Sequence, residues 1–111
     1  MVIEHEIRLL RLENGRIPYL EWYEMLSDKR MRVAVETRLA RVRNGNFGDH
    51  KLVGDGVSEL RLDIGPGLRI YYGEYQGKLV ILLGGGDKSS QQRDIATAIS
   101  WWKQWKQWKK K

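Results

Sequence analysis

The segment from Val57 to Ile95 constrains the fold more than any other part of the chain, because it reads as three short strands followed by a helix. Apolar and polar residues alternate over Val57–Ile64 and Leu68–Tyr72, as they do in strands that have one buried face. Lys78–Leu83 is nearly all apolar, which is typical of a central strand buried on both faces. Residues that favour tight turns separate the three strands. These are Gly65-Pro66-Gly67 and Gln76-Gly77.

The first half of the chain predicts one strand and two helices. Val2–Leu10 alternates loosely and suggests the strand. Tyr19–Leu26 and Lys29–Arg43 carry apolar residues at helical intervals. Asp49–Gly56 is interpreted as a loop. The side of the second helix that faces away from its apolar residues is expected to be cationic, through Arg30, Arg32, Arg38, Arg41 and Arg43.

Three consecutive glycines, Gly84–Gly86, are interpreted as a bend that leads into a last helix beginning near Ser90. Asp87 or Ser89 can cap this helix. Such a bend can present free backbone N–H groups to a phosphate, and a flexible turn before a helix cap explains the glycines equally well. The Walker A motif requires glycine immediately before Lys-Ser or Lys-Thr, where this chain has Asp87, so ATP binding is not predicted.

The predicted order of elements is βααβββα, which indicates an α+β fold: a curved antiparallel sheet with two N-terminal helices packed on it and a C-terminal helix, all on one side. The 111 residues suffice for one core, and we find no internal repeat. We therefore expect a single domain spanning residues 1–111.

Composition and charge narrow the possible partners and chemistry. Lys and Arg total 20 against 14 Asp and Glu, a net charge of +6 that suits nucleic acid, an anionic membrane or an acidic protein. There is no cysteine, and His5 and His50 are too isolated to form a ligand cluster, so no metal or other cofactor is expected. His50 is interpreted as an exposed loop residue, or as a general acid or base.

The N-terminal residues bear on localisation. Glu4, His5, Glu6 and Arg8 interrupt any apolar signal segment, and no run approaches the roughly 18 apolar residues that span a bilayer. We expect a soluble cytoplasmic protein without membrane attachment.

Arg61 and Arg69 are the first candidate site residues. If their strands pair through the intervening turn, both side chains lie on the same face of the sheet, where guanidinium groups can grip phosphates. The simpler alternative is that each arginine forms a surface salt bridge with Glu59, Asp63 or Glu74.

The C-terminal segment, residues 101–111, combines four tryptophans with five lysines. Trp102 continues the helical stripe of Ile95 and Ile99, so we expect it to pack on the sheet. Trp108 is flanked by lysine and is harder to bury. Base stacking, an anionic lipid surface and a hydrophobic partner remain alternatives for the exposed rings.

Several linked motifs, taken in order, resemble addiction-module killer proteins of the HigB-like branch of the RelE/ParE toxin superfamily. The resemblance covers about Tyr19 to Trp102, most of the chain. The motifs are Trp22, Leu26-Ser27-Asp28, Gly45-Asn46-Phe47-Gly48-Asp49, Gly56-Val57-Ser58-Glu59-Leu60-Arg61, Gly65-Pro66-Gly67-Leu68-Arg69-Ile70-Tyr71, Gly85-Gly86-Asp87-Lys88-Ser89, Gln92 and Asp94-Ile95.

The resemblance implies the toxin component of a type II toxin–antitoxin system from a bacterium. Its activity would be that of a ribosome-dependent, metal-independent mRNA endoribonuclease (an mRNA interferase) that inhibits translation and growth. The implied partners are mRNA, the ribosome and a cognate antitoxin of the helix-turn-helix, HigA-like kind. One alternative is a ParE-like toxin that inhibits DNA gyrase without cutting RNA. Another is a membrane-binding or partner-binding protein that acts through its Trp/Lys-rich tail.

The resemblance also implies roles for individual residues. Arg61 would contact the scissile phosphate, Arg69 would help to neutralise it, and Lys88 would protonate the leaving group or bind phosphate. The RelE pattern places a tyrosine in the opening turns of the last helix, and this chain has none there, so the general base is left open between Tyr71 and Asp94. The implied substrate-binding residues are Lys51, Tyr71, Gln92, Arg93 and Asp94.

Overall fold

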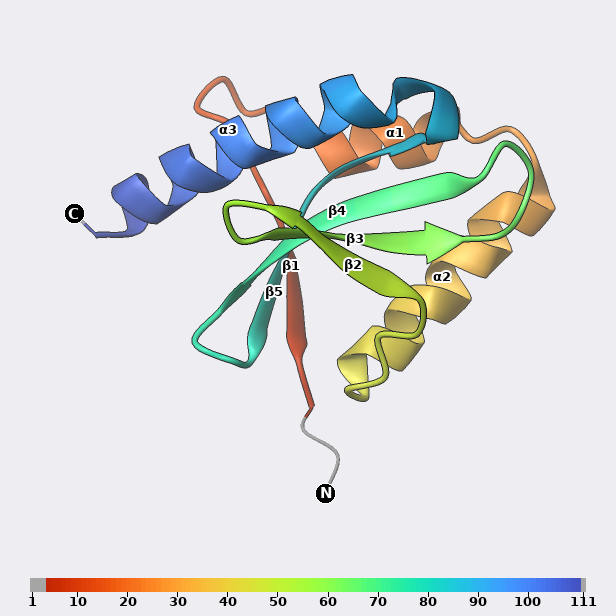
Figure 1. Ribbon diagram of the computed structural model, residues 1–111, viewed down its shortest axis with the longest axis horizontal. Helices are drawn as coiled ribbons and strands as arrows, with labels where there is room; N and C mark the ends of the chain where they lie inside the picture. Colours follow the sequence, from red (N-terminus) through yellow and green to blue (C-terminus); the bar gives the residue numbers. More distant parts are fainter. Residues whose placement is uncertain (1–3, 111) are drawn as a thin grey trace.

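Five strands form one mixed sheet in the order β1-β5-β4-β3-β2 in the computed structural model, which describes residues 4–110 (Figure 1). Predictions for Val2, Ile3 and Lys111 lie outside the described residues. The strands are β1 (Glu6–Leu9), β2 (His50–Gly54), β3 (Val57–Leu62), β4 (Leu68–Tyr75) and β5 (Leu79–Asp87).

In the described part of the chain, three α-helices and one short 3-10 helix accompany the sheet. α1 begins at Pro18, which suits a first helical position because proline lacks the N–H that a helix start leaves unpaired. The Asp28 side chain caps α2 by accepting a hydrogen bond from the Arg30 backbone N–H. The bounds are α1 (Pro18–Met25), α2 (Lys29–Arg43), η1 (Lys88–Ser90) and α3 (Gln91–Lys109).

The α+β class is confirmed, but two details of the predicted sheet are wrong. β1 pairs with β5 in parallel, so the sheet is mixed rather than antiparallel. The segment interpreted as a loop contains strand β2, which forms a hairpin with β3 through Asp55 and Gly56. Both turn residues have positive φ, a conformation that suits a tight hairpin connection. The observed order is therefore βααββββα.

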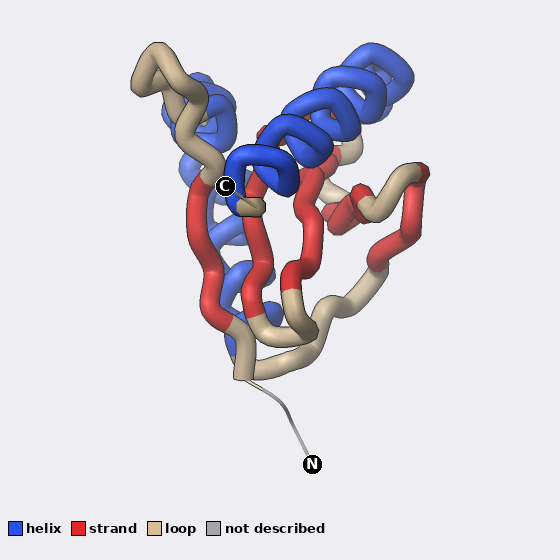
Figure 2. The backbone as a smooth tube through the Cα atoms, turned by 90° about the vertical axis from the view of Figure 1, so that its left-hand side faces the viewer, coloured by secondary structure: helices blue, strands red, loops and turns tan. Residues whose placement is uncertain are grey.

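The helices cover both faces of the sheet, which corrects the expectation that they lie on one side. α1 and α2 pack on the face formed by Leu60, Ile70 and Leu82. α3 packs on the opposite face, where Trp102 joins Tyr71 in a second core. Figure 2 shows α3, which ends at the label C, on the other side of the strands from the N-terminal helices.

Gly84–Gly86 do not form a bend, because they continue β5 and pair with Tyr71, Ile70 and Arg69 of β4. A close approach accounts for glycine at Gly85, where an added Cβ would lie 2.2 Å from the ring of Trp22. The chain turns only after Asp87, at η1.

Trp102 is buried, as predicted, and its ring covers Gly73 so closely that a Cβ there would lie 2.6 Å from it. Trp105 stacks on Trp102 with ring centroids 5.2 Å apart, whereas 67% of Trp108 is exposed. Among the described residues, no helix has both the length and the apolar character required to span a membrane.

Candidate functional site

Arg61 and Arg69 are direct cross-strand partners on β3 and β4, so they share one face of the sheet, as predicted. It is the face over which α3 lies. Lys51 of β2 pairs with Glu59, and Glu59 lies two residues before Arg61, so Lys51 belongs to this face as well. His50 lies on the opposite face, where its Nδ1 is 2.8 Å from the carbonyl oxygen of Gly48. That position separates His50 from the arginines.

Arg69 is not available to a phosphate, contrary to the role predicted for it. Its side chain is 9% exposed, and its Nε lies 3.0 Å from Oε2 of the fully buried Glu59. The Nε–H does not point at that oxygen, so the contact is an ion pair without a well-formed hydrogen bond. Nη1 of Arg69 donates to the carbonyls of Gly67 and Leu68. Arg69 thus pairs with Glu59, one of the partners of the salt-bridge alternative, but the pair is buried and is not the surface salt bridge that this alternative expected.

Gln91, the first residue of α3, completes this buried cluster. Its Nε2 donates to both carboxylate oxygens of Glu59, at 2.8 and 3.0 Å. The cluster of Glu59, Arg69 and Gln91 therefore joins the start of α3 to the centre of the sheet. The contact between Gln91 and Glu59 was not predicted from the sequence. The available signal was the position of Glu59 on the same strand face as the apolar Val57, a face that a later helix could cover.

Tyr71 and Asp94 also lie beneath or beside the start of α3. The Tyr71 hydroxyl is buried and has no hydrogen-bond partner among residues 4–110, and burial raises its pKa above the ordinary value. The Ser90 hydroxyl donates to Asp94 Oδ2 at 2.5 Å. Both residues line a cavity on the β5 side of α3. Arg61 lies two strands away from β5, about 10 Å along the sheet.

Arg61 remains open to solvent. Its side chain is 36% exposed, and its Nη2 lies 3.0 Å from Oδ1 of the exposed Asp49. Arg38 of α2 holds this pair in place by donating to the backbone carbonyls of Phe47, Asp49 and Arg61. Arg38 is buried, and burial lowers its pKa. The expectation that Arg38 belongs to an exposed cationic side of α2 is therefore wrong.

Lys88 is exposed on η1, and its backbone N–H donates to the Gly67 carbonyl. The Asp87 carboxylate accepts from the backbone N–H and the hydroxyl of Ser89, so Asp87 caps the short helix η1 and not the last helix, for which this cap was predicted. The N-cap of α3 is Ser90, whose side chain makes no capping hydrogen bond. The hydrogen bonds from Ser89 hold the pKa of Asp87 below its ordinary value. The carboxylate occupies the position at which a phosphate was expected, so this turn does not offer a free anion site.

We use the name cationic surface for four solvent-accessible cations of the strands on this face and of the segment that leads into α3. Arg61 and Lys51 come from the strands, and the remaining members precede or open α3. Gln92, in the first turn of α3, is also exposed. The positive charges of such a surface attract a polyanion that lies against it, and this attraction does not require a deep pocket. Within residues 4–110, no group of three or more His, Asp or Glu side chains is arranged to hold a metal ion. The cationic surface consists of Lys51, Arg61, Lys88 and Arg93.

The fold and this surface define a small basic α+β protein with a five-stranded mixed sheet and a cationic patch beside its last helix. Over 77 residues, which are 69% of this chain and 78% of the relative, the chain is 48% identical to an uncharacterized protein of Haemophilus influenzae. The chain therefore belongs to the same family as that protein. It matches no protein-family model and no solved structure.

Proposed function

We propose that this protein is a RelE/ParE-like toxin of a type II toxin–antitoxin pair, and that it acts in the cytoplasm as a metal-independent mRNA endoribonuclease. The linked motifs from Gly45 to Ile95 support the HigB-like assignment. The observation that carries the activity is Arg61, which is accessible on the face covered by α3 and paired only with an exposed carboxylate.

The proposed reaction is attack of a ribose 2′-oxygen on the adjacent phosphorus. The bond from phosphorus to the 5′-oxygen breaks, which leaves a 2′,3′-cyclic phosphate and a 5′-hydroxyl end. Arg61 stabilises the added negative charge of the transition state, and Lys88 supplies the proton to the departing 5′-oxygen. Asp49, the exposed carboxylate beside Arg61, accepts the proton of the 2′-hydroxyl.

This assignment of roles differs from the one that the resemblance implies. Arg69 acts through structure, because its buried contact with Glu59 keeps β3, β4 and the start of α3 together. Tyr71 is too deeply buried to serve as the base. Lys51, Gln92 and Arg93 bind the RNA backbone on either side of the scissile phosphate.

The test is induction of Arg61→Ala and Lys88→Ala variants in bacteria, with RNA 5′ ends mapped after induction. Both variants should lose growth arrest and cleavage by more than about 100-fold, because one stabilising contact to the transition state contributes on that order. Arg41→Ala, which removes an exposed arginine from α2, is the matched control and should cleave normally. Intact transcripts in cells arrested by the wild type would reject the nuclease.

A gyrase-directed, ParE-like toxin is the second candidate, and the burial of Arg69 favours it. Because Arg69 is buried, one of the two arginines that the nuclease hypothesis assigns to the phosphate is not accessible to RNA. Such a toxin would induce a DNA-damage response, and its growth arrest would survive Arg61→Ala. A fold alone does not distinguish the two activities.

The proposed partner is a helix-turn-helix, HigA-like antitoxin encoded next to this protein. Co-expression of the neighbouring reading frame should restore growth, and the two products should purify together. Mixing purified protein with translating ribosomes and mRNA then tests whether cleavage requires the ribosome.

A further inference from the structure

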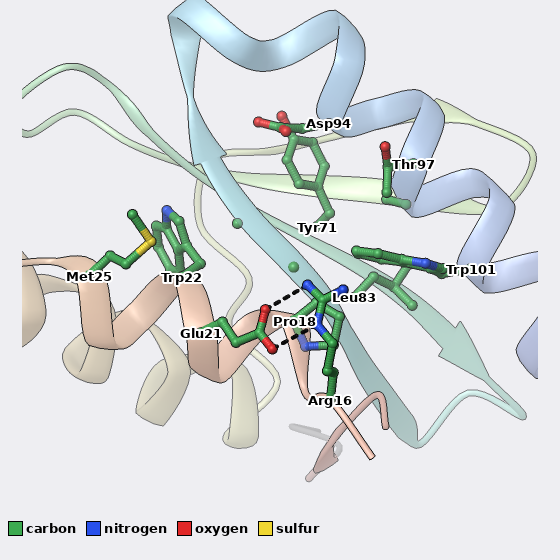
Figure 3. Close-up of a pocket in the computed structure, with 13 residues that line it drawn as sticks. Arg16, Pro18, Glu21, Trp22, Met25, Tyr71, Leu83, Asp94, Thr97 and Trp101 are labelled. Carbon is green, nitrogen blue, oxygen red and sulfur yellow. Dashed lines mark hydrogen bonds and ion pairs between the residues drawn. The ribbon is translucent and has the colours of Figure 1, made fainter. Parts of the chain in front are cut away.

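A cavity of about 270 Å³ lies between α1, the second half of β5 and α3, away from the cationic surface (Figure 3). It is smaller than the roughly 300–1,000 Å³ of sites for drug-sized ligands, so it suits one small group. Its walls come from elements distant in sequence, which is the arrangement of a cleft built by the tertiary fold. Nothing in the proposed cleavage reaction uses it.

The floor of the cavity is the β5 backbone at Gly84 and Gly85, against which the rings of Trp101 and Trp22 lie. β1 pairs with β5 only as far as Leu82 in the described chain, and Gly84 and Gly85 continue β5 beyond that point without side chains. The outer edge of β5 at these glycines therefore brings backbone polar groups close to any ligand in the cavity. Trp22 of α1 and Trp101 of α3 lie on opposite sides of the cavity in Figure 3.

The inner wall is polar and rich in acceptors. Tyr71 lines the cavity, and its hydroxyl is one of three buried side-chain polar groups in residues 4–110 that have no hydrogen-bond partner. Asp94 contributes a carboxylate, of which Oδ2 is bonded to Ser90. The Thr97 hydroxyl donates its proton to the Arg93 carbonyl, which leaves its lone pairs as acceptors. A ligand for this wall must therefore supply donors.

The outer rim consists of an ion pair rather than a free charge. Nη2 and Nε of Arg16 donate to the two carboxylate oxygens of Glu21, at 2.8 and 3.0 Å. Glu21 thus neutralises the cation nearest to the opening, so the cavity is not a phosphate site. A neutral, planar ligand with N–H groups agrees with these walls better than an anion does.

We propose that this cavity binds a single nucleobase, with guanine preferred, either free or within an RNA strand. Proteins recognise an unstacked base by contact with aromatic side chains and by hydrogen bonds to its Watson–Crick edge. Guanine presents an N1–H and a 2-amino group on that edge, and both donate to the carboxylate of Asp94. The Tyr71 hydroxyl gains the partner that it lacks. Uracil offers one N–H and suits the wall less well.

The experiment titrates guanosine into the full-length protein, with tryptophan fluorescence and amide NMR shifts as readouts. Guanosine should bind saturably with a Kd below about 1 mM and shift the amides of Gly84 and Gly85. Inosine lacks the 2-amino group and should bind several-fold more weakly, and uridine at least about tenfold more weakly, because each lost charge-assisted hydrogen bond matters in a buried site. A parallel arm uses the trinucleotides ApGpA and ApUpA, which distinguishes a base in RNA from a free nucleoside.

Variants separate recognition from folding. Asp94→Asn keeps the shape and an acceptor for Ser90 but removes the charge, and it should weaken guanosine binding at least about tenfold. Asp63→Asn changes an exposed carboxylate in the β3–β4 connection and serves as the matched control. Thr97→Leu fills part of the cavity and should also abolish binding. Unfolding curves confirm that each variant is folded.

Neither arm depends on cleavage, so loss of the nuclease proposal would leave this one standing, and the reverse also holds. The proposal is overturned if neither guanosine nor ApGpA perturbs the cavity residues at millimolar concentration. Equal affinity for guanosine and uridine would also overturn it, as would binding that Asp94→Asn leaves unchanged. Perturbation of the cavity by an antitoxin peptide but by no nucleoside or trinucleotide would assign it to protein recognition instead.

Discussion

Arg61 and Arg69 face each other across two neighbouring strands, yet they occupy opposite environments. Arg69 lies beneath the start of α3, beside a fully buried carboxylate. Arg61 is one strand further from β5 and faces solvent beside an exposed carboxylate. The difference comes from what covers each residue rather than from its type or its face. Removing one partner of a buried ion pair leaves an uncompensated charge in the interior, whereas an exposed pair leaves its cation free to exchange partners.

The comparison is tested most strongly at Glu59. Glu59→Ala leaves Arg69 buried without its countercharge, and we expect a loss of about 3–5 kcal/mol in the free energy of unfolding. Urea denaturation followed by circular dichroism measures this loss. Asp49→Ala, which breaks the exposed pair, should cost less than about 1 kcal/mol. Similar losses in the two variants would remove the contrast between the arginines.

Gln91→Ala should have the next largest effect. It removes both hydrogen bonds to the buried Glu59 carboxylate, with an expected loss of about 1.5–3 kcal/mol. Hydrogen exchange should accelerate first in the opening turns of α3, because Gln91 attaches them to β3. Gln92→Ala changes the exposed neighbour and should alter stability by less than about 0.5 kcal/mol.

Tyr71→Phe tests the same buried region of the sheet, beneath the start of α3. Deleting a buried hydroxyl that has no partner should stabilise the protein by about 1 kcal/mol at neutral pH. Burial raises the pKa of Tyr71, so the folded state retains a proton that the unfolded chain releases above pH 10. Wild-type stability should therefore fall as the pH rises above 10. The fall should be shallower in Tyr71→Phe, and an unchanged slope would contradict this assignment.

Arg61→Ala should change stability least, by about 0.5 kcal/mol, because its partner is exposed. Thermal unfolding measures this change on the same preparation that is used for RNA cleavage. A loss of several kcal/mol would show that Arg61 is a structural residue like Arg69, and a loss of activity in that variant would then carry no catalytic meaning.

The alternating pattern from Val57 onward predicted β3 and β4, because side chains on a strand alternate between its two faces, and the apolar run after Lys78 predicted β5. The alternation also predicted that Arg61 and Arg69 share a face. β2 was not predicted because it is an edge strand on which Lys51 and Leu52 are both exposed. Without a buried face, its sequence does not alternate between apolar and polar residues. β5 was predicted too short because its glycines carry no pattern, although the Trp22 ring requires one of them.

The sequence by itself determined the three α-helices, four of the five strands described in residues 4–110, the basic charge and the burial of Trp102 on the sheet. All of these depend on residues that are close along the chain or on the spacing of apolar side chains. Only the tertiary structure decided that α3 covers Glu59 and Arg69 while leaving Arg61 open, and that Tyr71 and Asp94 meet in a cavity beside α1. Those outcomes depend on where a helix crosses the sheet, which is set by packing between segments far apart in the chain, such as Trp102 on Gly73.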